Sequence, residues 1–377
     1  MSRNRNNGSR RSQKVNKQDR EISLAALIVV ALIIIVALRI WIGLATGEKT
    51  KDDYKITIGE QPNNTTTVQT VSDESALPDD WKDSVTAKTT DGVPIPKGFK
   101  FLEGTKNTGV VIQSEDSDKN EFVWVPVESL ADFKTEETYS SNGYNDDTST
   151  TEYINLKLSI AKYGGFYIGR YEASYKVGIE SNKKQYSEEE LATFRALTTK
   201  SIEATSNESE IINVPGKLWN NVNYKAAKAA SSNMYKAGSE LNTSGVVSHL
   251  VYGVEWDATM KWLEVKGKYG EANTVMTTAD MTTNGSKWGN YLDSTFDGHG
   301  VILPSGSITY TKANNIYDLA GNLFEWTQES AAAPTNKVYR GGSFKNNGYQ
   351  TLPIIRYSAP ESSYTTDIGF RPALYIK

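Results

Sequence analysis

Cysteine is absent from the 377 residues of this chain, and histidine occurs only twice. Without a thiol, the chain has no disulfide, no thiolate metal site, no cysteine nucleophile and no thiol redox couple. Packing, hydrogen bonds or hard cations must therefore hold the fold together. Eight Trp and twenty-one Tyr supply the aromatic mass for a sizeable core, so we expect a globular body of one or two domains.

Acidic residues outnumber basic ones outside the N-terminus. The net charge of the chain is −4, but residues 1–46 carry eight Lys and Arg against two acidic residues, so the remainder has a net charge of −10. Nucleic-acid-binding domains normally show a basic face. The acidic body therefore argues against a nucleic-acid partner, whereas it is compatible with solubility outside a cell and with cation binding.

One long apolar run stands near the N-terminus. The segment "ISLAALIVVALIIIVAL" spans residues 22–38, and the apolar run continues to Ala45 with Arg39 as its only charge. About 20 such residues cross the hydrocarbon core of a bilayer. Basic residues precede the run, so we expect residues 1–21 to be a cytoplasmic tail, 22–45 to be a single-pass signal anchor and the C-terminal part to be extracellular.

Two alternatives for this segment stay open. A cleaved signal peptide has a similar order of charges, although its apolar core is usually shorter and "GLATGEK" is a poor cleavage site. The segment also resembles the leader of prepilin-like proteins, but Glu21 stands where a Gly would precede cleavage. A prepilin-like envelope subunit is therefore an alternative function for the chain.

The body is predicted to be an α+β domain behind a polar linker. Residues 46–93 have the Thr-, Asp-, Ser- and Asn-rich composition of a flexible linker, and the folded domain is expected to span residues 94–377. Short aromatic or β-branched runs bounded by Gly or Pro predict strands, and two runs with helical spacing predict helices. The predicted strands are 121–127, 164–174, 337–344 and 368–376, the predicted helices are 221–237 and 253–267, and 131–155 and 271–312 are long polar stretches.

Five segments occur in a fixed order toward the C-terminus: "GFYIGRYEAS", "HLVYGVEWDATMKWL", "NNIYDLAGNLFEWTQES", "VYRGGSF" and "IGFRPAL". Together they resemble the formylglycine-generating (sulfatase-modifying factor) family, whose members share a C-type-lectin-like fold. The resemblance covers roughly residues 94–377. It implies a fold of short strands, two or more helices and long ordered loops, while function must be argued from the site itself.

The resemblance implies two redox chemistries that this chain lacks the residues to perform. Formylglycine-generating members hold copper with two cysteines, and the matching positions here are Asn346 and Thr351, which do not hold soft Cu(I). Relatives that make sulfoxides hold iron with three histidines, whereas this chain has only His249 and His299. Neither copper nor iron is expected, and an enzymatic role is not favoured.

The stretch from Asn314 to Ser330 admits a structural and a metal-binding interpretation. In the structural one, Gly321 and Asn322 form a turn with positive φ while Tyr317, Leu319, Phe324 and Trp326 enter the core. In the other, Asn322, Glu325 and nearby carbonyls supply hard oxygens to a structural Ca²⁺, as the resemblance implies for calcium-binding members.

Several polar residues are more simply explained by structure than by catalysis. Arg340 and Arg371 are expected to pair with carboxylates or carbonyls inside the fold. Glu255 and Asp257 stand two apart on a predicted helix, so they point to different faces and make a poor catalytic dyad. His249 is expected to be a hydrogen-bonded core residue.

We therefore expect a membrane-anchored extracellular binding module with no catalytic residues. Its loop-rich face would present aromatic side chains to a saccharide, a peptide or a surface protein, since flat rings stack and bind at low entropic cost. Equally, these aromatics could only pin the loops down. The residues concerned are Trp288, Tyr291, Tyr349, Tyr357 and Tyr364. A further alternative is an enzyme with metal-assisted chemistry, although the chain has no GxSxG, HExxH or Walker lysine motif.

Overall fold

The computed structural model describes residues 81–377 except 82, 140–142, 176–210, 217, 241 and 334. The predicted cytoplasmic tail 1–21, the predicted membrane segment 22–45 and most of the predicted linker 46–93 lie outside the described residues. Within the described part, no helix combines the length and the apolar character that a bilayer crossing requires.

A six-stranded antiparallel sheet forms the centre of the fold. Its strand order is β3-β4-β5-β6-β18-β9, so the last strand of the chain, β18, lies between two strands that come much earlier. Strand β5 pairs with β6 from Phe122 to Pro126 and joins the first three strands to the rest. The strands are β3 Phe99–Glu103, β4 Val111–Ser114, β5 Glu121–Pro126, β6 Gly165–Gly169, β9 Val246–Leu250 and β18 Pro372–Ile376.

Alternation along these strands fills two separate cores, one on each face of the sheet. Val123 and Val125 of β5 pack into a cluster that includes residues of three α-helices, whereas Phe122 and Trp124 enter a cluster on the other face. Side chains in a strand point alternately to the two faces, so a strand buried on both faces is almost wholly apolar. This accounts for the continuous apolar run "FVWV" in β5.

Four α-helices occur in the described part of the chain, and the three longer ones start at recognisable caps. Thr150 accepts a hydrogen bond from the amide of Tyr153, and Asn223 accepts one from Ala226. The third helix is capped by Glu255, whose carboxylate accepts a hydrogen bond from the Tyr252 amide. The helices are α2 Thr151–Tyr163, α4 Tyr224–Met234, α5 Gly253–Lys266 and α6 Thr278–Thr282.

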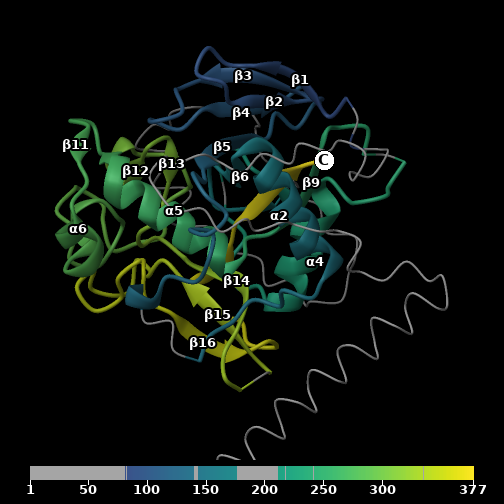
Figure 1. The fold of residues 1–377 in the computed structure, drawn as a ribbon. Helices are drawn as coiled ribbons and strands as arrows, with labels where there is room; N and C mark the ends of the chain where they lie inside the picture. Colours follow the sequence, from purple (N-terminus) through teal and green to yellow (C-terminus); the bar gives the residue numbers. More distant parts are fainter. Residues whose placement is uncertain are drawn as a thin grey trace, which may run out of the picture. The chain divides into compact units, whose positions relative to one another are not determined.

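A second sheet of four strands, β16-β15-β14-β17, contains the one parallel pair among the described strands. Strands β17 and β18 are separated only by Arg371, yet they belong to different sheets. In Figure 1, strands β1–β4 and strands β15–β16 lie at opposite ends of the view. The strands of this sheet are β14 Phe324–Ser330, β15 Asn336–Arg340, β16 Tyr357–Pro360 and β17 Ile368–Phe370.

Three small sheets complete the described structure. Two of them are two-stranded and the third has the order β11-β10-β12-β13. Their strands are β1 Val85–Lys88, β2 Pro94–Pro96, β7 Ser174–Tyr175, β8 Ile211–Ile212, β10 Lys268–Tyr269, β11 Thr274–Val275, β12 Lys312–Ala313 and β13 Ile316–Tyr317.

The prediction of an α+β fold is confirmed, and the predicted strands and helices need four corrections. The predicted strand 164–174 ends at Gly169, and the predicted strand 337–344 ends at Arg340 because Gly341 and Gly342 have positive φ. The predicted strand 368–376 is two strands in two sheets. The polar stretches 131–155 and 271–312 contain helices that were not predicted, since α2 begins in the first and α6 lies in the second.

Folded structure also extends to the N-terminal side of Pro94, the residue at which the domain was expected to begin. Strand β1 pairs with β2 across a turn. Trp81 is buried, and its ring centroid lies 6.0 Å from that of Tyr375 in the C-terminal strand. Because residues 46–93 contain few large apolar residues, neither this short strand nor the burial of Trp81 was predicted.

Candidate functional site

The turn between β13 and β14 has the predicted geometry. Gly321 and Asn322 both have positive φ, 72° and 59°. Leu319 and Trp326 are fully buried and Phe324 nearly so, as the structural interpretation required, whereas Tyr317, which was also expected in the core, is only half-buried. A side chain at Gly321 would collide with the backbone of Asn290, so glycine is required here for space as well as for conformation.

The side chain of Asn322 joins three segments of the chain. Its Oδ1 accepts hydrogen bonds from Asn290 Nδ2 and from the Leu303 amide, both at 3.0 Å. Its Nδ2 donates to Glu172 Oε2 at 2.6 Å and to the Leu303 carbonyl at 3.1 Å. Every hydrogen-bonding position of the amide is therefore occupied by protein.

Glu325 lies in a separate network, where Arg371 occupies both of its oxygens. Arg371 Nη2 donates to Glu325 Oε1 at 2.6 Å, and Arg371 Nε donates to Oε2 at 2.9 Å. The same guanidinium donates to the carbonyls of Gly169 and Tyr317, and both charged side chains are fully buried. Burial raises the pKa of the Glu325 carboxyl, and the charge of Arg371 opposes this rise.

These contacts do not fit the calcium site that the sequence analysis placed at Asn322 and Glu325. Calcium takes 6 to 8 oxygen ligands. The Asn322 oxygen already accepts two hydrogen bonds, and the Glu325 carboxylate is bound by a guanidinium. Among the residues described, no three His, Asp or Glu side chains group in a way that could hold a metal ion.

Calcium is accordingly expected to leave thermal stability unchanged. A site with a micromolar Kd would stabilise the domain by about 4 kcal/mol in millimolar calcium, which is a shift of several degrees in Tm. Melting curves of the full chain in excess chelator and in millimolar calcium should therefore superimpose. A calcium-dependent rise in Tm that persists in an Asn322→Ala variant would place calcium elsewhere, and loss of the rise in that variant would restore the original prediction.

A second network of buried charges joins Arg340 of β15 to Asp257 of α5. Arg340 Nη2 donates to Asp257 Oδ1 at 2.9 Å, and Arg356 Nε donates to Glu329 Oε1 at 2.7 Å. Arg356 Nη2 also bonds Asp257, so both arginines share this carboxylate. The predictions of structural roles for Arg340 and Arg371 are thereby confirmed.

The prediction that Glu255 and Asp257 point to different faces of their helix is also confirmed. Asp257 binds the two arginines, whereas both oxygens of Glu255 lie within 3.0 Å of His249 Nε2. His249 is fully buried between strands and helix, as expected for a core histidine. Neither carboxylate is therefore placed for acid–base catalysis.

Asp146 adds a third carboxylate beside this network, at the N-terminus of α5. It accepts hydrogen bonds from the amides of Gly253 at 3.0 Å and Val254 at 2.8 Å. Burial, together with the nearby Glu329 carboxylate, raises the pKa of Asp146 to about 7. In the folded protein this carboxyl therefore takes up a proton at a pH where an unfolded aspartate is ionised.

An Asp146→Asn variant is expected to change how stability depends on pH. Because the folded pKa is raised, the contribution of Asp146 is full below about pH 4 and is lost as the pH rises through about 7. The free energy of unfolding of the wild type, relative to that of the variant, should fall by about 2 kcal/mol across this range. The fall is smaller than for a fully buried carboxyl, because Asp146 keeps some solvent exposure. Urea unfolding between pH 4 and pH 8 measures the difference.

The neighbouring Asp147 provides the matched control. It is exposed, and hydrogen bonds from Ser149 lower its pKa. An Asp147→Asn variant should therefore show a much smaller trend of the opposite sign. A wild-type advantage over Asp146→Asn that stays constant from pH 4 to pH 8 would contradict the assignment.

Asn346 and Thr351, at the positions where the resemblance implies metal-binding thiols, stabilise loops instead. Ser343 Oγ donates to Asn346 Oδ1 at 2.7 Å, and the Asn346 carbonyl accepts from the Leu292 amide at 2.9 Å. The Thr351 carbonyl accepts from the Tyr291 hydroxyl at 3.0 Å. Loop 285–293 thus donates hydrogen bonds to two carbonyls of loop 345–351, and these bonds hold the two loops together.

Of the five aromatics predicted to face a ligand, two are core residues. Trp288 and Tyr291 are fully buried, with Trp288 Nε1 donating to the Asp280 carbonyl and Tyr291 donating to the Gly341 carbonyl. The prediction of a ligand contact is therefore wrong for both, because they pin the loops from inside. Tyr357 is half-buried and stacks on Tyr339.

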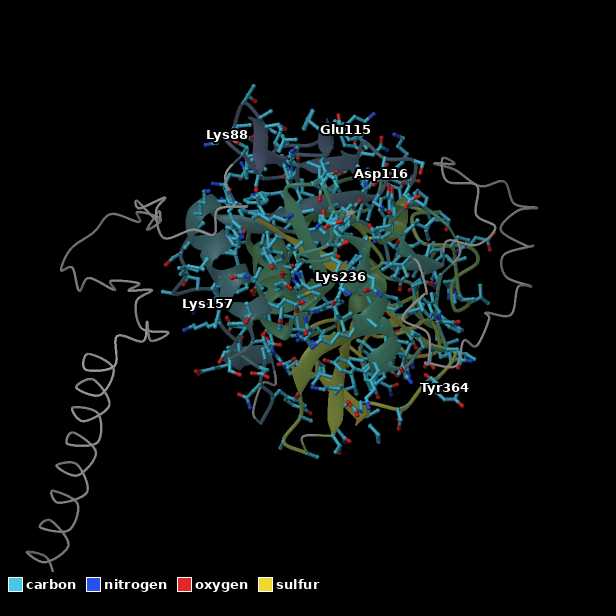
Figure 2. The ribbon with its side chains drawn as sticks, turned by 90° about the vertical axis from the view of Figure 1, so that its right-hand side faces the viewer. Lys88, Glu115, Asp116, Lys157, Lys236 and Tyr364 are labelled. Carbon is cyan, nitrogen blue, oxygen red and sulfur yellow. The ribbon has the colours of Figure 1, made fainter. Side chains whose placement is uncertain are left out.

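Tyr349 and Tyr364 remain exposed, at 54% and 58% of their surface, and Tyr364 lies at the periphery of the view in Figure 2. Sequence reasoning missed two aliphatic neighbours of this region. Leu292 is 53% exposed and Val301 is 37% exposed. The available signal was a single apolar residue inside a polar stretch, which is too common at protein surfaces to identify a site.

Comparisons with known proteins agree with this geometry at the level of the family. The profile of the sulfatase-modifying factor enzyme 1-like domain matches residues 162–376. No curated protein matches the sequence.

The solved structures that are similar to this chain have low sequence identity to it. PvdO from Pseudomonas aeruginosa is 16% identical, with 74% of this chain and 99% of that chain covered and a TM-score of 0.37. Treponema denticola variable protein 1 is 14% identical, with coverage of 55% and 95% and a TM-score of 0.29. CarF is 15% identical, with coverage of 57% and 87% and a TM-score of 0.30.

Proposed function

This chain belongs to the sulfatase-modifying factor enzyme 1-like domain family, and we propose that it is a membrane-anchored binding module that holds a peptide or protein partner outside the cell. The family's copper-dependent oxidation of cysteine is not part of this proposal. It would require two thiols, and the chain has none. Asn346 and Thr351 instead fasten the loops at the corresponding positions.

The surface that supports the proposal is the loop face, which we define as residues 290–301, 345–350 and 364–367. Its first two segments are joined by the bond from the Leu292 amide to the Asn346 carbonyl. The second and third are joined by Lys345, whose Nζ donates to Thr366 Oγ1 at 2.6 Å. The loops therefore form one prearranged surface, and little ordering entropy opposes binding.

The single observation that carries the proposal is the exposure of large apolar side chains on this fastened surface. Leu292 lies against Gly300 in the loop face, Val301 follows Gly300 in the chain, and Tyr349 and Tyr364 belong to the other two segments of the face. Aliphatic side chains favour contact with the apolar side chains of a polypeptide over the hydroxyl groups of a sugar. A peptide or protein partner therefore suits the loop face better than a saccharide.

Anchoring by residues 22–45, with the folded domain outside, is the second part of the proposal. It is supported by the length of the apolar run and by the basic residues that precede it. Protease added to intact cells should digest the domain of the full chain and leave only a tail of the size of residues 1–45 protected. Full protection of the chain in intact cells would contradict extracellular exposure.

Site-specific photo-cross-linking of the full chain in its own cells tests the loop face. A photoreactive residue at Tyr349 and one at Tyr364 should give adducts with the same partner, whereas one at Val275, which is 63% exposed on β11, should not. A Leu292→Asp substitution should reduce both adducts by about tenfold, since burying an unpaired charge costs more than 1.4 kcal/mol.

The matched control is Val265→Asp, which places the same charge on an exposed apolar residue of α5. This variant should cross-link as the wild type does. Equal losses in the two variants would show an effect of charge alone, and identical adducts from residues 275 and 349 would show non-specific contact. Either result would contradict a binding role for the loop face.

A further inference from the structure

A hollow with a volume of about 150 Å³ opens in the domain away from the loop face. It lies between the turn before β2, the end of β5 and the C-terminal turn of α2, none of which belongs to the loop face (Figure 1). Such a volume admits several water molecules or a single six-membered ring. The lining residues that the argument uses are Asp91, Lys106, Trp124, Glu128, Lys162 and Tyr163.

Hydrogen bonds fix the walls of the hollow on several sides. The Val127 amide donates to the Gly164 carbonyl at 2.9 Å, which ties the end of β5 to the end of α2. The Tyr167 hydroxyl donates to the Pro94 carbonyl at 2.8 Å and holds β2 against the sheet. The Lys106 amide donates to Asp91. The hollow is therefore present before any ligand arrives, as is usual for ligand sites.

A hydrogen-bond donor in the lining lacks a partner. The Trp124 side chain is 1% exposed, and its Nε1–H has no acceptor among the described residues. A buried N–H without an acceptor costs about 1–3 kcal/mol. A ligand oxygen at the inner end of the hollow would supply the missing acceptor.

The charges around the hollow are balanced and do not favour an ion. The lining contains two lysines, Lys106 and Lys162, and two carboxylates, Asp91 and Glu128. Both Asp91 oxygens already accept hydrogen bonds, from Thr89 Oγ1 and the Lys106 amide, and these bonds lower the pKa of Asp91. The C-terminal end of α2 at Gly164 adds partial negative charge, which disfavours an anion.

We propose that this hollow binds one neutral sugar ring, with Trp124 and the two lysines donating to ring or hydroxyl oxygens and Glu128 accepting from a hydroxyl. Pro94, Val127 and the Tyr163 ring would face the C–H side of the sugar, as apolar and aromatic walls do in carbohydrate sites. Glu128 is exposed, so it would lie at the mouth, and Asp91, which is exposed as well, already accepts hydrogen bonds from Thr89 and Lys106. This site is independent of the partner proposed for the loop face.

Ligand-observed NMR on the full chain tests the proposal, in a detergent without a sugar headgroup so that the detergent does not compete. Glucose, galactose and N-acetylglucosamine are titrated separately by saturation transfer. At least one should bind with a millimolar Kd. Glu128→Ala and Trp124→Phe should each weaken binding by about tenfold, since each removes one hydrogen bond to the ligand.

Two controls distinguish this site from others. Glu115→Ala removes an exposed carboxylate at a turn of the same domain, labelled in Figure 2, and should leave the Kd unchanged. Tyr349→Ala on the loop face should also leave it unchanged. Absence of saturation for all three sugars would overturn the proposal, as would binding that survives Glu128→Ala, a surface substitution that leaves the core intact. Neither failure would affect the cross-linking result expected at Tyr349.

Discussion

Replacing Arg371 with methionine is expected to destabilise the domain by about 3–5 kcal/mol. The guanidinium makes three hydrogen bonds to Glu325 and two to backbone carbonyls, and it is fully buried. Removing it leaves the Glu325 charge in the interior without a partner. This loss is a large fraction of a typical domain stability of about 5–15 kcal/mol. Urea unfolding of the full chain, followed by tryptophan fluorescence, measures the loss.

Two further variants separate the buried charge from the lost packing. Adding Glu325→Gln to Arg371→Met removes the uncompensated charge, so the double variant should recover part of the loss. Lys345→Met breaks the half-exposed pair with Asp367, whose atoms are 3.5 Å apart, and should cost less than about 1 kcal/mol. A loss for Arg371→Met as small as that for Lys345→Met would contradict the buried ion pair.

Residues 162–377, which correspond to the segment matched by the family profile, are expected not to fold alone. Strands β3, β4 and β5 precede this segment but form half of the central sheet, and β5 pairs with five residues of β6. Without them the apolar face of β6 and the cluster around Phe166 and Ile168 would meet water. An exposed, apolar strand edge also promotes aggregation.

Expression of residues 162–377 beside residues 81–377 tests this expectation. The longer segment should give a cooperative urea transition and dispersed amide NMR signals, whereas the shorter one should be insoluble or show neither. A cooperative transition for residues 162–377, with an m-value in proportion to its length, would show that β3–β5 are dispensable.

The parts of the fold that could be predicted depend on neighbours in sequence. The α4 helix is an Ala-rich run that begins directly after an Asn, and this residue, Asn223, accepts the capping hydrogen bond from the Ala226 amide. The Gly321–Asn322 turn needs positive φ, which these two residues tolerate better than others. Both features arise from contacts within a few residues, so a single sequence contains the information.

The incorrect predictions concern contacts between distant segments. Nothing near Asn322 in the sequence indicates that Glu172 and Asn290 occupy its amide. The run 368–376 reads as one strand, and its division at Arg371 depends on where Glu325 lies. Without these partners, oxygen-rich residues at short spacing suggested a calcium site.

The aromatic residues show the same difficulty. Trp288 and Tyr291 stand among Gly, Asn and Ser in a stretch with no period of 2 or 3.6, so the sequence gives no direction for their side chains. The structure buries both beneath the loops, and Tyr349 and Tyr364 stay outside. Of the residues that the loop face exposes, Tyr349 and Tyr364 were therefore predicted, whereas Leu292 and Val301 were not.

The central position of β18 has a consequence for biosynthesis. Strand β18 pairs with β6 on one side and β9 on the other, so β9 joins the other strands of the sheet only through residues that follow all the other described strands in the chain. A nascent chain that has been made only to Arg371 has an open edge at β6 and leaves β9 without a partner strand in this sheet. The ribosome must therefore release the chain beyond Ile376 before the six-stranded sheet can be completed, and during this interval a chaperone has access to the incomplete domain.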